Sequence, residues 1–189
     1  MRRLILQQFT TIDGLAADDD GGTDFISEYA TKRDATFESE AMEFMDSIDT
    51  MVLGRRTYEL FVQYWPEVSG PDAEFGRKLN ALDKYVVSTT LDEAPWGRFS
   101  PATVMRDPAE VEALKERAGK DIVIWGSISL ATYLLRRGMI DEIQLRVVPV
   151  ALGSGQQLFD EELPAPAMNL VGASPHDAGL VVLRYEVSR

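Results

Sequence analysis

Two arginines stand where an apolar run gives way to a helical pattern, in the stretch DTMVLGRRTYEL at 49–60. Gly54 ends the strand-like run, and apolar residues recur at helical spacing after Thr57. Cations at a helix start face the positive end of the helix dipole, at a cost of roughly a few tenths of a kcal/mol each. A phosphate bound to the free N–H groups of the first turn would offset that cost. Gly54, Arg55, Arg56 and Thr57 are therefore a candidate anion site.

Two further places at strand ends carry residues that could also bind an anion. VIWGSISL, 123–130, is a strand-to-helix junction, and VSTT, 87–90, ends a strand in hydroxyls. In an open α/β sheet, ligands bind beyond the carboxyl ends of the strands, and a glycine there lets a ligand approach the backbone. The candidates at these two places are Gly126, Ser127 and Ile128, and Ser88 and Thr89. Taken singly, each turn is also explained by ordinary turn chemistry or a helix cap.

The elements that must position these junctions follow from the hydrophobic pattern. Apolar strand-like runs alternate with amphipathic helical patterns, which is typical of α/β proteins with a largely parallel sheet. Strands are expected at 4–9, 50–53, 121–125 and within 84–91 and 101–105. Helices are expected at 37–48, 56–65, 73–82 and 126–135, and another from Asp107 as N-cap with Pro108 at its first position. Alternation over 141–150 and two strands around a turn over 167–189 predict antiparallel strands at one edge.

Composition narrows the class of protein. A chain of 189 residues with 45% hydrophobic and 26% charged residues is expected to form one globular domain, 1–189. No apolar run approaches the roughly 20 residues that cross a bilayer, and the N-terminal stretch predicts a strand, not a signal peptide. The lack of cysteine excludes disulfides and thiolate chemistry and fits a cytoplasmic protein.

The charge balance restricts the partners. A net charge of −12 argues against nucleic acid and anionic membranes, and makes any anionic ligand depend on locally gathered positive charge. Neither G-x-G-x-x-G nor a P-loop motif occurs. The adjacent carboxylates of 18–20 lack a ligand-spaced framework, so no metal site is predicted. His176, in the turn SPHDAG, is expected to be an exposed loop residue and not a general base.

Four stretches in register carry a family resemblance. TTIDGLAA, LGRRTYE, YVVSTTL and IDEIQLRVVPVALGSGQQLF occur in an order and at a spacing that closely resemble the dihydrofolate-reductase-like superfamily. The resemblance is nearest to the reductase domain of the bifunctional riboflavin-biosynthesis deaminase–reductase and its free-standing relatives, and spans about 3–189. It implies a three-layer α/β fold: a mixed, mostly parallel central sheet, helices on both faces and an antiparallel C-terminal hairpin. The zinc signature of the deaminase is absent, so only a reductase unit is implied.

The resemblance also implies an NADPH-dependent reductase with a small-molecule substrate. Turn 54–57 matches the helix start that holds cofactor phosphate, and turn 126–128 matches the second phosphate-binding turn. Positions 88 and 89 match the strand end that receives the adenosine 2′-phosphate. The residues themselves favour NADP over NAD. Three strand ends carry residues that suit an anion, and no acidic residue is placed to bind the ribose hydroxyls, as one does in NAD-binding proteins.

The substrate side depends on two carboxylates that the resemblance singles out. Asp13 lies in the loop that borders nicotinamide and substrate, although Asp-Gly is also a common turn pair. Riboflavin-type reductases commonly carry a lysine after this pair, where Leu15 and Ala16 stand here. Glu38 matches the acid that binds the pterin ring in folate-type reductases, with a pKa raised by burial. Glu38 and its neighbour Glu40 are alternatively solvent-facing helix charges.

Several readings stay open. Tyr64 and Trp65 are either ring-stacking walls or core residues, and Trp125 either packs in the sheet or narrows the site. The substrate is a pteridine, an aminopyrimidine of the 5-amino-6-ribosylamino-uracil phosphate type, or another small heterocycle. A nucleotide- or flavin-binding protein without turnover, or a structural protein that inherits the fold, are the alternatives. The strand at 141–150 and the C-terminal hairpin would support either a homodimer or an intramolecular sheet edge.

Overall fold

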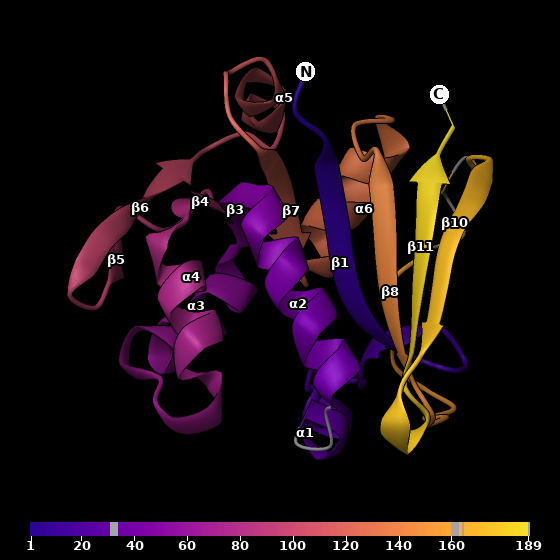
Figure 1. The fold of residues 1–189 in the computed structure, drawn as a ribbon. Helices are drawn as coiled ribbons and strands as arrows, with labels where there is room; N and C mark the ends of the chain where they lie inside the picture. Colours follow the sequence, from indigo (N-terminus) through magenta and orange to yellow (C-terminus); the bar gives the residue numbers. More distant parts are fainter. Residues whose placement is uncertain (31–33, 160–162, 164, 189) are drawn as a thin grey trace.

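The computed structural model describes residues 1–30, 34–159, 163 and 165–188. Within them, one nine-stranded sheet has the order β10-β11-β8-β1-β7-β3-β4-β6-β5 (Figure 1). Its strands are β1 Leu4–Thr11, β3 Ile48–Gly54, β4 Asp83–Val87, β5 Ala94–Trp96, β6 Phe99–Met105, β7 Asp121–Trp125, β8 Glu142–Val148, β10 Met168–Pro175 and β11 Val181–Val187. The six strands from β8 to β6 in this order pair in parallel, whereas β5 and the β10–β11 hairpin pair antiparallel.

Helices cover both faces of this sheet (Figure 1). They are α1 Asp24–Ala30, α2 Ala35–Ser47, α3 Arg55–Tyr64, α4 Ala73–Ala81, α5 Glu110–Lys115 and α6 Ile128–Arg136. α2, α3 and α4 pack on one face, and α5 and α6 pack on the other. A two-stranded sheet of β2 Leu15–Ala17 and β9 Gln156–Gln157 lies apart from the main sheet. The predicted mixed, mostly parallel three-layer fold with a C-terminal hairpin is confirmed.

The alternation of side chains along each strand builds two cores. In β7, Ile122 and Ile124 enter the cluster beneath α5 and α6, while Val123 and Trp125 enter the cluster beneath α2, α3 and α4. Successive strand residues point to opposite faces, so a strand that is apolar throughout is buried on both sides. This is why the run DIVIW predicts an interior strand.

The register of the parallel strands brings the predicted junctions to one edge. Gly54 at the end of β3 lies opposite Val87 of β4, and Val52 lies opposite Ile124 of β7. Parallel strands end at the same edge, so the residues that follow β3, β4 and β7 lie side by side there. The turns 54–57 and 126–128 and the strand end at 88–89 therefore share the carboxyl edge of the sheet.

Some elements differ from the sequence prediction. β1 continues to Thr11, and β2, β5, β9 and α1 are not predicted, because elements of two to seven residues offer little periodicity. α5 begins at Glu110 and not near Pro108. The carboxylate of Asp107 accepts a hydrogen bond from Ala109 N (2.8 Å), and Glu110 Oε1 accepts one from Asp107 N (2.9 Å), so a turn precedes the helix.

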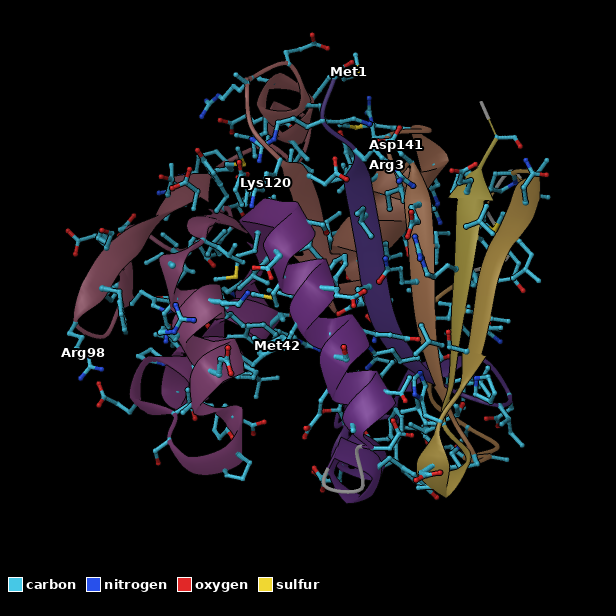
Figure 2. The ribbon with its side chains drawn as sticks, viewed as in Figure 1. Met1, Arg3, Met42, Arg98, Lys120 and Asp141 are labelled. Atoms are coloured by element: carbon cyan, nitrogen blue, oxygen red, sulfur yellow. The ribbon has the colours of Figure 1, made fainter. Side chains whose placement is uncertain are left out.

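The amino edge of the sheet is closed by paired charges. Asp121 accepts a hydrogen bond from Arg3 N (2.9 Å), and Asp141 accepts one from Leu4 N (2.8 Å). Lys115 forms an ion pair with Asp141 and is only 4% exposed. Figure 2 shows Arg3 and Asp141 together at the upper end of β1, away from the carboxyl edge.

Candidate active site at the carboxyl edge of the sheet

A cavity of about 1130 Å³ opens at the carboxyl edge, between the helices of the two faces. Its wall includes turn 54–57, turn 126–128 and Glu38. Of the predicted site residues, these eight come together around one space. Asp13, Ser88 and Thr89 are not among the described residues that line it.

The two glycine turns contact each other directly. Ser127 Oγ accepts a hydrogen bond from Gly54 N (2.7 Å) and lies 2.9 Å from Thr57 Oγ1, to which it donates. A Cβ on Gly54 would lie 3.2 Å from the Ser127 side chain, and one on Gly126 would lie 3.1 Å from Thr57 Oγ1. Gly126 also has a φ of 56°, a left-handed conformation that suits glycine. Glycine at both positions therefore allows the two helix starts to meet at one point.

The helix starts at these turns, α3 and α6, have no side-chain cap and no acidic residue in their first turn. The other described α-helices differ, because each has an acidic residue in its first turn: α1 has Asp24, α2 has Glu38, α4 has Glu74, and α5 has Glu110 and Glu112. Unpartnered N–H groups and the dipole make an uncapped helix start favourable for an anion. Two such ends meet at the cavity of a protein whose net charge is −12.

The two arginines add positive charge beside these helix starts. Arg55 Nη1 is 2.9 Å from Glu59 Oε1 one turn further along α3, and both side chains are nearly half exposed. Arg56 reaches over the acidic loop, where its Nη1 lies 3.3 Å from the position of a Cβ on Gly21. Both arginines line the cavity. They are placed to contact an anionic ligand at the paired turns.

Ser88 and Thr89 lie at the same edge, next to the cavity and outside its lining. Ser88 Oγ accepts hydrogen bonds from Thr90 N (3.2 Å) and Leu91 N (3.1 Å), which is the geometry of a hydroxyl-stabilised turn. Arg106, just after β6, donates from Nη1 to Ser88 O (3.1 Å). Sequence reasoning missed Arg106. The sequence indicated it by a cation that directly follows the strand PATVM, so that it lies at the same edge of the sheet as the ends of β3 and β4.

The side of the cavity formed by α2, α3 and α4 is aromatic. We call it the ring chamber, and its residues are Phe37, Leu60, Phe61, Tyr64, Trp65, Phe75, Leu79 and Trp125. Neighbouring ring centroids lie 5.0 Å apart for Tyr64 and Trp65, and 6.0 Å apart for Phe61 and Trp125. Trp65 and Trp125 also pack in the core beneath α2, α3 and α4, which confirms the core alternative for both residues, and both line the cavity. Such a wall suits a planar apolar ligand.

Glu38 contributes a carboxylate to the cavity wall from α2. Its side chain is exposed, which agrees with the alternative of a solvent-facing helix charge and not with the buried carboxylate that the family resemblance implies. Exposure keeps the carboxylate hydrated.

Asp13 is tied to a neighbouring loop. Its carboxylate accepts hydrogen bonds from Gly153 N (2.8 Å) and Leu152 N (3.4 Å). A side-chain hydrogen bond with Thr11, followed by the bond from Gly153, lowers the pKa of Asp13 below its ordinary value. The geometry therefore gives Asp13 the task of holding the loop after β1 to the loop that precedes β9.

The prediction of an exposed His176 is wrong. Its side chain is 2% exposed, with Nδ1 at 3.4 Å from Asp34 Oδ1 and Nε2 at 3.4 Å from Glu40 Oε2. Its ring meets Phe37 edge-on, with centroids 5.2 Å apart. The turn that carries His176 folds against the start of α2, a long-range contact that turn composition does not reveal.

A chain of buried amide side chains supports Trp125. Trp125 Nε1 donates to Gln7 Oε1 (2.7 Å), Gln7 Nε2 donates to Gln144 Oε1 (2.9 Å), and Gln144 Nε2 donates to Glu142 Oε1 (2.7 Å). We call this the glutamine relay. Sequence reasoning missed it, although the polar residues inside the strands LILQQF and DEIQLR were its signal.

Other classes of site find no support in the described part of the chain. Over residues 1–30, 34–159, 163 and 165–188, no three His, Cys, Asp or Glu side chains are grouped so as to hold a metal ion. No helix in the same residues is both long and apolar enough to cross a bilayer.

Comparison with known proteins identifies the family. Residues 2–182 match the model of the RibD C-terminal domain, and the chain belongs to this family. The uncharacterized protein YyaP of Bacillus subtilis (strain 168) is 31% identical over 188 residues, which cover 97% of this chain and 94% of YyaP. The family resemblance stated from the sequence is thereby confirmed.

Solved structures agree with the fold. A putative riboflavin biosynthesis protein from Shewanella sp. PV-4 superposes with a TM-score of 0.74 at 21% identity, over 99% of each chain. Dihydrofolate reductase from Enterococcus faecalis, complexed with NADP(H), superposes with a TM-score of 0.62 at 13% identity, over 99% of this chain and 97% of that one. At these identities the likeness establishes the dihydrofolate-reductase-like fold.

Proposed function

We propose that this protein is an NADPH-dependent reductase that transfers hydride to a small heterocyclic molecule of pteridine or riboflavin-pathway type. The observation that carries the proposal is the pair of uncapped, acid-free helix starts that meet at the cavity. Membership of the RibD C-terminal domain family and the fold shared with an NADP(H)-bound dihydrofolate reductase support it.

The residues present fit a nicotinamide dinucleotide phosphate. Turns 54–57 and 126–128 would hold its diphosphate through free N–H groups, because no Cβ at Gly54 or Gly126 fills the space between them. The Arg55 side chain, at the start of α3 beside the end of β4, would receive the 2′-phosphate together with Arg106 and Thr89, where Ser88 fixes the turn. When bound, the cofactor supplies the hydride.

The protein would supply orientation and a proton. Reduction of a C=N or C=O bond consumes one hydride at carbon and one proton at the heteroatom. The ring chamber would hold the acceptor ring, and Glu38 is the carboxylate that could pass a proton from solvent to it. Asp13 would act indirectly, by fixing the loop after β1.

The test is a titration of NADPH and NADH into the protein, with an Arg55→Ala variant. The variant is expected to weaken NADPH binding by about tenfold and NADH binding by less, since charge-assisted contacts to the extra phosphate are lost. Arg98→Ala is the matched control, because Arg98 lies at the tip of the β5–β6 hairpin, away from the cavity (Figure 2). Equal losses for both nucleotides would assign Arg55 to the diphosphate instead.

A nucleotide- or flavin-binding protein without turnover remains the second candidate. Such a protein would also bind NADPH, but it would not transfer hydride from NADPH to a substrate. An oxidation assay separates the reductase from the binding protein. NADPH is mixed with the protein and with dihydrofolate or a riboflavin-pathway aminopyrimidine, and its oxidation is followed at roughly 340 nm, in the absorption band of the reduced nicotinamide. A protein that binds NADPH and oxidises none of it with any heterocycle would be the binding module.

Assembly and location stay predictions. We propose a homodimer because the edge strand β10 exposes Leu170 and Val171, at 57% and 47%. Sedimentation velocity of the wild-type protein and a Leu170→Asp variant tests this. A cytoplasmic location would agree with the absence of cysteine.

A further inference from the structure

Two large apolar side chains face the cavity and are nevertheless exposed. Leu60 is 59% exposed and Tyr64 is 49% exposed, and they lie one turn apart on α3. Both line the cavity. Exposed apolar groups on a concave wall mark a surface that a ligand covers. The occupant of the ring chamber must therefore present an apolar or aromatic face to α3.

Trp125 forms the sheet side of the same chamber. It is 7% exposed at the end of β7, and the rings of Phe61 and Phe75 lie 6.0 Å and 6.4 Å from it. The glutamine relay fixes its indole, because Gln7, 4% exposed, accepts the indole N–H. A buried and satisfied network of this kind allows one orientation. The chamber is therefore a preformed slot for a flat ring.

Charge is divided unevenly around the cavity. Among the described residues that line it, Arg55 and Arg56 stand at the paired turns, and Glu38, Asp72 and Arg146 stand around the ring chamber. The guanidinium of Arg146 lies over the ring of Phe37, 4.9 Å from its centroid. Among the described lining residues, two carboxylates thus accompany one cation that is already stacked on an aromatic face. The charge that these described residues present to a second phosphate is therefore net negative.

The loop after β1 brings no further cation to this side. Leu15 and Ala16 follow Asp13 and Gly14, and both are buried, at 6% and 1%. Their apolar side chains pack inward and cannot hold an anion.

We propose that the ring chamber accepts a planar aromatic ring system that carries no phosphate group, and that Leu60, Tyr64 and Trp125 determine this preference. The inference rests on the proposed function and deepens it. It places the phosphate groups of the reaction on the cofactor alone. The phosphorylated aminopyrimidine is then excluded as the preferred substrate.

The test uses one ring with and without a phosphate. Riboflavin and riboflavin 5′-phosphate are titrated calorimetrically into protein saturated with NADP⁺. Riboflavin is expected to bind at least about tenfold more tightly, because the phosphate must be desolvated beside carboxylates. Equal affinity, tighter binding of the phosphorylated ring, or no binding of either ring would overturn the inference.

Variants locate the preference. Leu60→Asp is expected to weaken riboflavin binding by about tenfold, whereas Leu60→Lys is expected to narrow the difference between the two ligands. Ser100→Asp is the control, because it adds the same carboxylate at an exposed position on β6 that does not line the cavity. Unchanged riboflavin affinity in both Leu60 variants would contradict the assigned site.

Binding of NADP⁺ is measured in the same protein samples and tests the proposed function separately. If NADP⁺ does not bind, the proposed function fails, while the two flavins can still be compared in its absence. If NADP⁺ binds and the phosphorylated ring is preferred, the proposed function stands and only the inference fails.

Discussion

The two edges of the central sheet treat charge in opposite ways. At the amino edge, Asp121 and Asp141 accept backbone hydrogen bonds from the start of β1, and buried Lys115 pairs with Asp141. At the carboxyl edge, α3 and α6 begin without a cap and without an acid in their first turn. The acidic chain thus pairs its charges at one edge and leaves positive potential at the other.

This difference separates stability from function. A charge that is both buried and paired within the folded chain, such as that of Lys115, stabilises the fold and is not accessible to a ligand. Unpartnered N–H groups and clustered cations cost stability until an anion arrives. Changes at the amino edge should therefore alter unfolding without altering binding, and changes at the carboxyl edge should alter binding more than unfolding.

The largest expected effect is on stability, from Lys115→Met. The substitution leaves Asp141 without its buried partner and Met139 O without the hydrogen bond from Lys115 Nζ (2.7 Å). Loss of one partner of a buried ion pair costs about 3 kcal/mol or more. Urea unfolding measures the loss, and NADPH affinity of the folded variant should be unchanged. Lys120→Met is the control, since the exposed Lys120 Nζ donates to Asp46 O (2.7 Å), and its loss should cost less than about 0.5 kcal/mol.

The glutamine relay connects the two edges, so Gln7→Leu should affect both properties. It leaves the Trp125 N–H and Gln144 Oε1 unpaired, which costs about 2 kcal/mol of unfolding free energy. It should also shift the tryptophan emission maximum and weaken ring binding several-fold, with NADPH affinity unchanged.

Gln8→Leu is the control for Gln7→Leu. Gln8 is equally buried at 6%, and its Oε1 has no hydrogen-bond partner among the described residues. The control should retain the wild-type emission maximum. A shift as large as that of Gln7→Leu would show that the relay does not position the indole.

The paired turns are tested by Gly126→Ala. Its Cβ would meet Thr57 Oγ1 at 3.1 Å, and its φ of 56° strains an alanine, so a cost of about 1 kcal/mol is expected. NADPH affinity should fall about tenfold as the two helix starts separate. Gly138→Ala isolates the strain, because Gly138 has a φ of 62° and its Cβ would meet nothing within 4 Å. Equal loss of affinity in the two variants would refute a role for turn contact.

The sequence was sufficient to predict the edge where the site lies. Gly54 and Gly126 interrupt apolar strands, and parallel strands end together, so local pattern and topology combine to place both turns. The sequence also shows directly that the helices after these glycines begin without an acidic residue in their first turn. The positions of α3 and β7 follow from the same periodicity to within one or two residues.

Other features depend on contacts between distant segments. His176 looks like a loop residue until the turn that carries it packs on Asp34 of the α2 start, 142 positions away. The relay joins Gln7 to Gln144 across neighbouring strands whose pairing the sequence does not specify. Ser88 is predicted as a phosphate ligand by its position, which stays a prediction, and the turn that its hydroxyl stabilises by accepting hydrogen bonds is visible only in the structure. Side-chain direction and long-range register decide such cases.

The smallest expected effect is on the pH dependence of stability, and it concerns the start of α2. This helix start is capped by a side chain, in contrast to the uncapped starts of α3 and α6. The Asp34 carboxylate accepts hydrogen bonds from Asp177 N (2.6 Å) and Phe37 N (2.7 Å). Both bonds lower the pKa of this carboxyl, and the bond from Asp177 lowers it most. A lowered pKa in the folded state means that the carboxylate stabilises the fold above its unfolded pKa of about 3.9. This contribution is lost as the pH falls below about 4 and through the lowered value.

Asp34→Asn should therefore make the urea midpoint depend less on pH between about 5 and 3, with NADPH affinity at neutral pH unchanged. Asp92→Asn is the control, because the Asp92 side chain is fully exposed and pairs only distantly with Arg106, at 3.5 Å. If the acid dependence of Asp34→Asn matched that of wild type, the cap would not hold α2 in the folded protein. Weaker NADPH binding in Asp34→Asn would mean instead that a capped helix start also serves the cavity, and the division between stabilising and binding helix starts would fail.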